Sequence, residues 1–465
     1  MTVNEDIPGA LPSTRHARDL GFKLSDLKSK GGYKWFGRVF DDPRWLFRLL
    51  RCWPKAGFQW FGGWTIVTRF DDVQEVLAHD QVFGVPYGEK TQKLNGGPNF
   101  LLGMEDGECY RRYQKLVMRA FRLEDARCVV SRMAARLSRE LLEASPGRID
   151  AIEGLLTRVA VLICKEYYGL PISDPTVFGL WTIAMSTHIF VDAATVVPAH
   201  RDAAEAAAER IRALVDGAIV QARTNPRSSD TVLSRLIEMQ ATERCLTDEM
   251  IRAFLIGMVM GFVPTNTLAG GNILAALLRR RSFLAMLLRR RSFMSHAREA
   301  ALADDDDLLQ RCLFEALRFK HIHWGLTRIC HKDYTIAEGT SRRKLIRVGA
   351  KVLASTWSAM FDPRRIKNPN VFDSFRPPTD YMLLGYGLHW CIGAYIAYAQ
   401  ITQTFKQLLV QKDLKRARGK EGRLQLLGDF PQHLWMEFTA RASGPEPPPG
   451  AKGRHPKLKS GQLGM

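Results

Sequence analysis

The sequence is poor in paired cysteines: it holds eight cysteines among 465 residues, and no two of them stand in a CxxC arrangement. Zinc sites often use such pairs and small secreted proteins use a regular cysteine framework, so neither a zinc site nor a disulfide scaffold is indicated. A reducing compartment, the cytoplasm, fits this cysteine usage best. The first twenty residues contain acids and prolines but no apolar core, so we expect neither a signal peptide nor a membrane anchor there.

A long uninterrupted hydrophobic run is also missing. The most apolar stretch, residues 251–278, is broken by four glycines, two asparagines, two threonines and a proline. These residues suit a lipid-exposed span poorly, so we expect a buried helix and no integral membrane segment. Thr247, followed by two acidic residues, is a typical N-cap for this helix.

Acidic residues are in the minority, because 48 Asp and Glu stand against 67 Lys and Arg and give a formal net charge of +19. This balance favours a partner of negative charge. No RNA-binding or zinc-finger signature accompanies the basic residues, so nucleic acid is not the expected partner. With 46% hydrophobic and 25% charged residues, the composition is that of a globular protein.

Helical patterns dominate the chain, most clearly over residues 108–245, which are rich in alanine and arginine. We predict a mainly α protein with small β-sheets, folded as a single large domain over residues 31–442. In this prediction residues 1–30 form a polar, loosely held extension and residues 443–465 a disordered tail rich in proline, glycine and lysine. Short β-prone runs are expected at residues 64–69, 334–336, 345–348 and 351–353.

One short repeat interrupts this pattern: LLRRRSF occurs at residues 277–283 and again at 287–293. The spacing is too short for a solenoid unit, so we interpret the repeat as a small tandem duplication on an exposed helix or connector. Its arginine triplets are then a solvated face, and they predict no activity.

The strongest chemical signal is the segment LGYGLHWCIG. It contains a single cysteine, Cys391, and three glycines, Gly385, Gly387 and Gly393. Glycines adopt positive φ readily and let a backbone approach a planar cofactor closely, and their N–H groups can point at a sulfur ligand. The helix-forming residues 394–409 follow, so Cys391 would lie beside a helix N-terminus, whose dipole favours an anionic sulfur. A buried cysteine in a glycine-rich turn is the alternative.

This segment resembles the haem-binding loop of the cytochrome P450 family, which reads FxxGxxxCxG and usually has a basic residue two positions before the cysteine. The resemblance implies that Cys391 is the axial thiolate ligand of haem b (iron protoporphyrin IX) and that His389 contacts a haem propionate. It also implies the cytochrome P450 fold, over about residues 35–440. Leu384 stands where the family has phenylalanine, which changes the packing against the sulfur.

A second motif supports the resemblance. Glu315 and Arg318 form an ExxR motif that places a carboxylate and a guanidinium on one helix face. The distance of this motif from Cys391 is typical of the family, and Arg376 resembles the arginine that completes the family's network. The resemblance implies that these three residues are structural and hold the cysteine loop in place. Arg328 similarly resembles a propionate-binding arginine.

Residues 104–121 align without gaps to a further helix of the family, but the expected ligands differ. Tyr110 occupies the position of the usual propionate-binding histidine, and Gln114 that of the usual arginine. We therefore expect Arg112 or Lys115 to replace the lost cation, with Tyr110 and Arg112 both in the cofactor site.

The helix expected on the oxygen-binding side departs further from the family. The sequence GFVPT stands where the family usually has AGxDT or AGxET, so Thr265 keeps the alcohol of the catalytic pair and Pro264 replaces its acid. Proline removes an N–H and kinks a helix, which would open a carbonyl groove. In the alternative interpretation Pro264 only shapes the pocket and water supplies the protons.

The resemblance implies a haem-thiolate monooxygenase that inserts one oxygen atom from dioxygen into an apolar small molecule. Apolar walls are expected from Val263 and from the loop at residues 86–100. A ferredoxin or flavodoxin would supply electrons at a cationic face made of Arg111, Arg112, Lys115, Arg119 and Arg122. Because the acid at position 264 is missing, a hydroperoxide-using peroxygenase or isomerase is the first alternative, and a non-catalytic haem-binding protein is the second.

Overall fold

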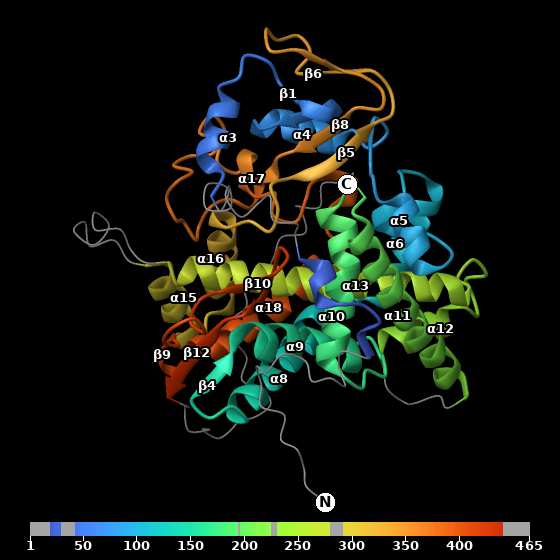
Figure 1. Ribbon diagram of the computed structural model, residues 1–465, viewed down its shortest axis with the longest axis vertical. Helices are drawn as coiled ribbons and strands as arrows, with labels where there is room; N and C mark the ends of the chain where they lie inside the picture. The colour runs from blue at the N-terminus through green and yellow to red at the C-terminus, as the bar shows by residue number, and fades with distance from the viewer. Residues whose placement is uncertain (1–18, 29–41, 194–195, 225–229, 280–291, 440–465) are drawn as a thin grey trace, which may run out of the picture.

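The structure is a computed structural model of the chain, and helices make up most of it (Figure 1). It describes residues 19–28, 42–193, 196–224, 230–279 and 292–439. The predicted mainly α, single-domain organisation with small sheets is confirmed. The helices of eight or more residues are α3 (Arg44–Arg51), α4 (Phe70–Ala78), α5 (Gly88–Asn95), α6 (Glu108–Ala120), α8 (Ser131–Glu143), α9 (Arg158–Glu166), α10 (Pro175–Ser186), α11 (Pro198–Thr224), α12 (Val232–Met239), α13 (Asp248–Leu277), α15 (Phe293–Leu302), α16 (Asp306–Phe319) and α18 (Ala394–Leu409).

The largest sheet lies at the end of the molecule drawn at the top of Figure 1, above the helices. Its five strands have the order β1 (Phe58–Trp60), β2 (Trp64–Val67), β8 (Lys351–Ala354), β5 (Leu326–Cys330) and β3 (Phe83–Gly84). β2 pairs with β8 in parallel, and β8 pairs with β5 in antiparallel register, with Arg328 opposite Val352. The strand that carries Arg328 is therefore held on both edges.

Three smaller sheets complete the described structure. They comprise β4 (Arg148–Asp150), β12 (Trp435–Thr439) and β9 (Lys412–Arg416), then the pair β10 (Gln425–Leu427) and β11 (Phe430–His433), then the pair β6 (Tyr334–Ile336) and β7 (Lys344–Ile346). The four β-prone runs expected from the sequence correspond to β2, β6, β7 and β8. The strands between residues 412 and 439 were not expected, because their side chains alternate only weakly between polar and apolar.

The long helix α13 runs through the interior, as expected. Thr247 accepts a hydrogen bond from the Met250 N–H (3.3 Å) and so caps its N-terminus. By length and hydropathy α13 would pass as a membrane span, but 83% of its most apolar window is buried against other parts of the protein. It packs against α10, α11 and α16. Pro264 lies inside it without ending the helix.

Part of the first thirty residues belongs to the core. Leu20 and Leu27 are buried, and the Trp181 indole N–H donates to the Leu20 carbonyl (3.2 Å). The expectation of a loosely held extension is therefore wrong for residues 19–28: its sparse leucines pack against α11, a contact that the polar local composition does not indicate. The domain limits at residues 30 and 443 stay predictions.

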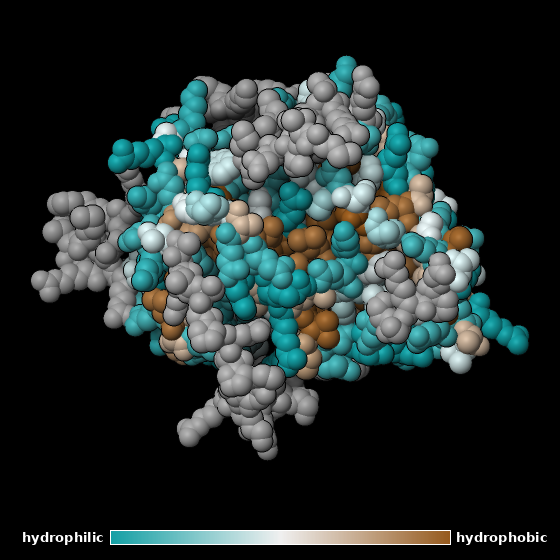
Figure 2. All heavy atoms as spheres, turned by 90° about the horizontal axis from the view of Figure 1, so that it is seen from below, coloured by the Kyte–Doolittle hydropathy of each residue, from teal (hydrophilic) through white to brown (hydrophobic). Residues whose placement is uncertain are grey.

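Other expectations concern the surface. On the face seen in Figure 2, hydrophilic side chains surround smaller apolar areas, as is usual for a globular protein. The LLRRRSF repeat lies largely outside the described residues. The segment at residues 86–100 was expected to be a loop, but it contains the helix α5. Gly96, in a left-handed conformation (φ 65°), ends this helix.

Candidate active site

Cys391 lies in a tight turn between the 3-10 turn at Gly387–His389 and α18. Its N–H donates to the Leu384 carbonyl (2.9 Å), and its own carbonyl accepts from the Ala394 N–H (3.2 Å). Cys391 lies three residues before the first residue of α18, and its side chain is half-buried. Burial raises the pKa of the thiol, whereas a hydrogen bond from the Gly393 N–H lowers it. The expected N–H donor to the sulfur is therefore present.

The three glycines of this loop serve different purposes. Gly385 and Gly387 have φ of 86° and 73°, a region that residues with a Cβ rarely adopt. A Cβ on Gly387 would also lie 2.3 Å from the Leu77 carbonyl oxygen, so the loop packs closely on α4. Gly393 has φ −86° and needs no positive φ, contrary to the expectation; its Cβ would instead meet the Cys391 Sγ at 4.0 Å.

Tyr110 reaches the cysteine loop but Arg112 does not. The buried Tyr110 hydroxyl donates to the Leu388 carbonyl (2.9 Å), and its ring meets the His389 ring edge-on at 5.2 Å. Burial raises the pKa of Tyr110 to about 12, so the phenol stays neutral and acts as a donor. Two residues along a helix turn the side chain by about 200°. Arg112 consequently points to solvent near Glu243, and the expectation that it joins the site is wrong.

Arg328 is the most unusual cation of the site. Its side chain is fully buried, and its Nη1 donates to the Thr327 carbonyl (3.1 Å). Among the described residues its Nε and Nη2 have no hydrogen-bond partner. Burial lowers the pKa of Arg328, and burial together with the Arg328 charge lowers the pKa of His389 to about 3. Two donors of this buried guanidinium are therefore available to bind an anion.

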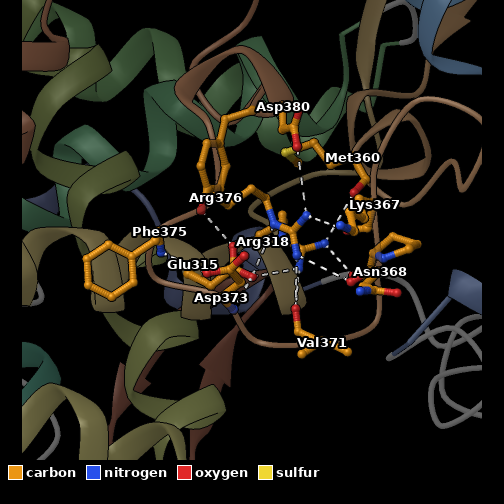
Figure 3. A network of polar contacts seen from close by, with 12 residues as sticks. Glu315, Arg318, Met360, Lys367, Asn368, Val371, Asp373, Phe375, Arg376 and Asp380 are labelled. Atoms are coloured by element: carbon orange, nitrogen blue, oxygen red, sulfur yellow. Dashed lines mark hydrogen bonds and ion pairs between the residues drawn. The ribbon is translucent and has the colours of Figure 1, made fainter.

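Glu315, Arg318 and Arg376 form one buried network (Figure 3). Arg318 binds both carboxylate oxygens of Glu315, at 2.9 and 2.7 Å. Its third nitrogen, Nη1, donates to the Pro369 carbonyl (2.7 Å). Arg376 lies 3.5 Å from Glu315 and donates to the Lys367 and Val371 carbonyls. The network thus ties α16 to the irregular segment that leads into the cysteine loop.

Two further groups of this network escaped the sequence analysis. The Tyr381 hydroxyl donates to Glu315 Oε2 (2.7 Å), and the Asp373 N–H donates to Glu315 Oε1 (3.1 Å). Burial raises the pKa of Tyr381, so its proton stays on the phenol. Neither residue stands at a motif spacing from Glu315, and the sequence carries no signal for them beyond their position near Arg376.

On α13, Gly261 and Thr265 lie on the face that stays open. Gly261 is exposed, with nothing within 4 Å of the place of a Cβ, in a helix that is otherwise largely buried. The Thr265 hydroxyl donates to the Gly261 carbonyl, one turn earlier. The neighbouring turn of α13 approaches the cysteine loop, because Met258 Cε is 3.8 Å from the position of a Gly393 Cβ. This contact places α13 beside the cysteine loop at Met258.

Pro264 leaves one backbone carbonyl of α13 without its helical donor. In a regular helix the N–H of residue 264 would donate to the Met260 carbonyl, but proline has no N–H. The buried Ser186 hydroxyl, at the end of α10, donates to that carbonyl (3.2 Å). Ser186 thus satisfies the acceptor that Pro264 exposes, and this pairing explains how proline is accommodated without breaking the helix.

The comparisons with known proteins agree with this site. The sequence profile of the family described as Cytochrome P450 matches residues 63–425, which is most of the chain. The chain belongs to the cytochrome P450 family. It is accordingly an oxidoreductase, a haem-thiolate monooxygenase.

The relatives compared with this cytochrome P450 come from bacteria. The mycinamicin IV hydroxylase/epoxidase of Micromonospora griseorubida is 25% identical over 74% of this chain and 81% of its own. The erythromycin C-12 hydroxylase of Saccharopolyspora erythraea is 26% identical over 77% of this chain and 86% of its own. Among solved structures, cytochrome P450 CYP109Q5 from Chondromyces apiculatus superposes with a TM-score of 0.69 at 19% identity, over 87% of this chain and 97% of that one. The expected P450 fold is confirmed.

The residues of the site fit the haem of a cytochrome P450. Iron protoporphyrin carries two propionate carboxylates, and the unpaired guanidinium of Arg328 lies buried close enough to His389 to shift its pKa. The sulfur of Cys391 already accepts a backbone N–H. On α13, no described atom lies within 4 Å of the position of a Gly261 Cβ, which leaves room for a flat group.

Ser186→Ala tests the role of Pro264 in this P450. We expect the free energy of unfolding to fall by about 1–3 kcal/mol, because the buried Met260 carbonyl loses its donor. In a Pro264→Ala background the restored N–H binds that carbonyl, so the same substitution should cost much less. Urea denaturation of the four proteins measures the difference. Ser138→Ala, which removes another buried serine hydroxyl, is the control and should cost the same in both backgrounds.

Proposed function

We propose that this cytochrome P450 binds haem b with Cys391 as its axial thiolate ligand. The observation that carries the proposal is the hydrogen bond from the Gly393 N–H to the sulfur, in a loop that packs on α4 through Gly387. Such a donor stabilises a thiolate, and the adjacent N-terminus of α18 adds a favourable dipole. Burial raises the pKa of the Cys391 thiol. A bound metal cation would lower this pKa and so favour the thiolate.

We further propose that Arg328 and His389 bind the haem propionates. Arg328 has two donors without partners among the described residues, and a carboxylate would satisfy both in a bidentate pair. In this proposal Tyr110 does not bind a propionate as the histidine usual at its position does. Its hydroxyl donates to the Leu388 carbonyl and so fixes the backbone next to His389. The usual arginine of this helix is not replaced by Arg112, so Arg328 carries the anion-binding charge.

When bound through a thiolate, haem supplies the reductive activation of dioxygen that places one oxygen atom in a C–H or C=C bond. The chain must exclude water and deliver protons. Thr265 holds a hydroxyl proton against the Gly261 carbonyl, and Pro264 provides no carboxylate beside it. We propose that Thr265 positions a water in this open turn of α13, and that solvent supplies the protons that an acid supplies elsewhere in the family.

The substrate class proposed is an apolar small molecule. On α13, a Cβ at Gly257 would fall 2.2 Å from the Phe100 ring, so this ring lies directly against the helix backbone. Phe100 in turn meets the Phe254 ring edge-on at 6.4 Å. Val263, expected as a wall, is fully buried in the core. The relatives named above act on mycinamicin IV and erythromycin, and CYP109E1 of Bacillus megaterium has been solved with corticosterone, which supports a hydroxylation or epoxidation of such molecules.

A ferredoxin or flavodoxin in the cytoplasm is the proposed electron donor. The cationic face expected at residues 111–122 is less charged than its sequence indicates, because all four of its arginines lie beside acids. Arg111 pairs with Asp106 (2.9 Å), Arg119 with Glu243 (2.6 Å) and Arg122 with Asp230 (3.1 Å), and Arg112 is 3.9 Å from the same Glu243. These pairs are exposed and therefore weak, so an acidic carrier can compete for the arginines at low salt.

A comparison of oxidants tests the monooxygenase reaction. Purified holoenzyme is screened for ligands that change its spin state, and the best ligand is then incubated either with NADPH and a ferredoxin–reductase pair or with hydrogen peroxide alone. We expect an oxygenated product, with one label from ¹⁸O₂, in the reductase arm. Turnover with peroxide only would contradict the proposal and favour the peroxygenase alternative. Turnover in neither arm, with haem retained, would favour a non-catalytic haem-binding protein.

A further inference from the structure

Two adjacent tyrosines, Tyr167 and Tyr168, follow the C-terminus of α9 and have no part in the haem site described above. Their side chains are buried, with exposed fractions of 2% and 0%. The Tyr168 hydroxyl has no hydrogen-bond partner among the described residues, and burial raises its pKa far above the usual value. A buried hydroxyl without a partner costs free energy, so phenylalanine would suit this position better for stability alone. The hydroxyl therefore needs an explanation other than packing.

Contacts along one face of α13 connect Tyr168 to the cysteine loop. Met258 Cε and Cys391 Sγ lie 3.8 and 4.0 Å from the position that a Gly393 Cβ would take, so the thioether lies next to this loop. Phe262 follows Met258 by one helical turn on the same face of α13, and its ring centroid is 5.8 Å from that of Tyr168. Burial is the largest cause of the raised pKa of Tyr168, and the Cys391 charge adds to it. A path of sulfur and aromatic groups thus leads from the loop to Tyr168.

Tyr167 continues this path to a carboxylate. The centroids of the two tyrosine rings are 5.9 Å apart. The Tyr167 hydroxyl donates to Asp125 Oδ2 (3.0 Å), which also accepts from Arg235 Nη1 (2.5 Å). Arg235 in turn pairs with Asp230, whose side chain is 60% exposed. The path therefore ends near the surface, at a phenol whose proton has an acceptor.

The two phenols differ in what their oxidation would require. A phenol that loses an electron becomes a strong acid, so it must also lose its proton or else hold a buried positive charge. Tyr168 has no acceptor for that proton among the described residues, whereas Tyr167 donates to a carboxylate. The Arg235 guanidinium, 5.7 Å from the Tyr167 ring centroid, further disfavours a cation there. An unpaired electron is therefore expected to reside on Tyr167, as a neutral radical.

We propose that the two tyrosines form a redox relay that carries oxidising equivalents away from the haem when no substrate consumes them. In each passage one electron moves from Tyr167, by way of Tyr168, to haem that a peroxide has oxidised, and the Tyr167 phenol proton moves to Asp125 Oδ2. The haem is thereby reduced by one equivalent, Tyr167 becomes a neutral radical and the carboxylate becomes a carboxylic acid. The relay rests on the proposed binding of haem by Cys391, and it is separate from the oxygenation of substrate.

Electron paramagnetic resonance of the substrate-free holoenzyme tests the relay. The ferric protein is mixed with hydrogen peroxide and rapidly frozen, and we expect a tyrosyl radical signal that narrows when ring-deuterated tyrosine is incorporated. Tyr167→Phe should abolish this signal, and Asp125→Asn should reduce it strongly because the phenol loses its basic proton acceptor. Tyr398→Phe is the matched control. Tyr398 also lies near Cys391, whose charge adds to burial in raising the pKa of this phenol, but it lies outside the path, so the signal should persist.

Tyr168→Phe separates the relay from packing. Removal of the unpartnered hydroxyl should leave the urea denaturation midpoint at or above that of the wild type, while the radical signal falls and peroxide bleaches the haem faster. Each variant should keep the wild-type circular dichroism and Soret band, and Tyr167→Phe decides the test if Asp125→Asn folds poorly. A signal that persists in Tyr167→Phe, a signal lost in Tyr398→Phe, or no tyrosyl signal in a wild type with its Soret band would overturn the relay. A wild type without that band would overturn the proposed haem binding as well.

Discussion

Cys391→Ala is expected to abolish the thiolate-type Soret band in the reduced carbon-monoxide difference spectrum. Cys391 is the cysteine whose sulfur accepts the Gly393 N–H beside the N-terminus of α18, and alanine offers no ligand atom. The loop itself should survive, because its turn is closed by the backbone hydrogen bond from residue 391 to Leu384. A spectrum without that band, on a protein with wild-type circular dichroism, is the expected result.

Two other cysteines provide the control for this spectrum. Cys52 is exposed and Cys245 half-buried, and neither lies in the glycine-rich loop. Cys52→Ala and Cys245→Ala should therefore leave the spectrum unchanged. A thiolate band that persists in Cys391→Ala, or one that disappears in either control, would assign the iron to another sulfur.

Glu315→Ala should destabilise the protein by about 3–5 kcal/mol, because it leaves the buried charges of Arg318 and Arg376 without their carboxylate. The Tyr381 hydroxyl and the Asp373 N–H lose their acceptor at the same time. A loss of this size is a large part of the stability of most domains, so the yield of folded holoprotein should also fall sharply. Urea denaturation followed by tryptophan fluorescence measures the change.

Asp307→Ala is the matched control, since Asp307 is an exposed carboxylate in the first turn of the same helix, α16. It should cost only about 0.3–1 kcal/mol, through the helix dipole. Arg318→Lys should fall between the two, because an ammonium keeps the charge but cannot bind both Glu315 oxygens and the Pro369 carbonyl. A wild-type denaturation midpoint for Glu315→Ala would show that the network does not stabilise the fold.

Local signals predicted the parts of the site that depend on short spacings. The glycines around Cys391, the helix that follows it and the Glu315–Arg318 pair all lie within a few residues of one another, so backbone geometry and helix periodicity bring them together. The Thr247 cap of α13 was predicted for the same reason. What these motifs cannot contain is the identity of distant partners, such as Tyr381 for Glu315 or Leu388 for Tyr110.

The errors also have physical causes. Arg112 was expected in the site because residues 104–121 align with a haem-binding helix of the family. Two residues along a helix, however, place the Arg112 side chain on the opposite side from Tyr110. Pro264 was expected to open a carbonyl of α13, but the sequence did not indicate that a serine from another helix satisfies this carbonyl. Arg119 and Arg122 were interpreted as part of a free cationic face because the acids that pair with them lie elsewhere in the chain. The last two cases concern tertiary contacts between elements far apart in sequence, whereas the first is a matter of local helix geometry.

The contact between Phe100 and Gly257 has one further consequence. The ring fits only because residue 257 has no Cβ, so the shape of this wall depends on the absence of a single carbon. Any larger residue at position 257 would have to displace the ring, and a shorter residue at position 100 would leave a gap over the helix. The packing of this segment on α13 can thus change by exchanges at these two positions, without any alteration to the cysteine loop.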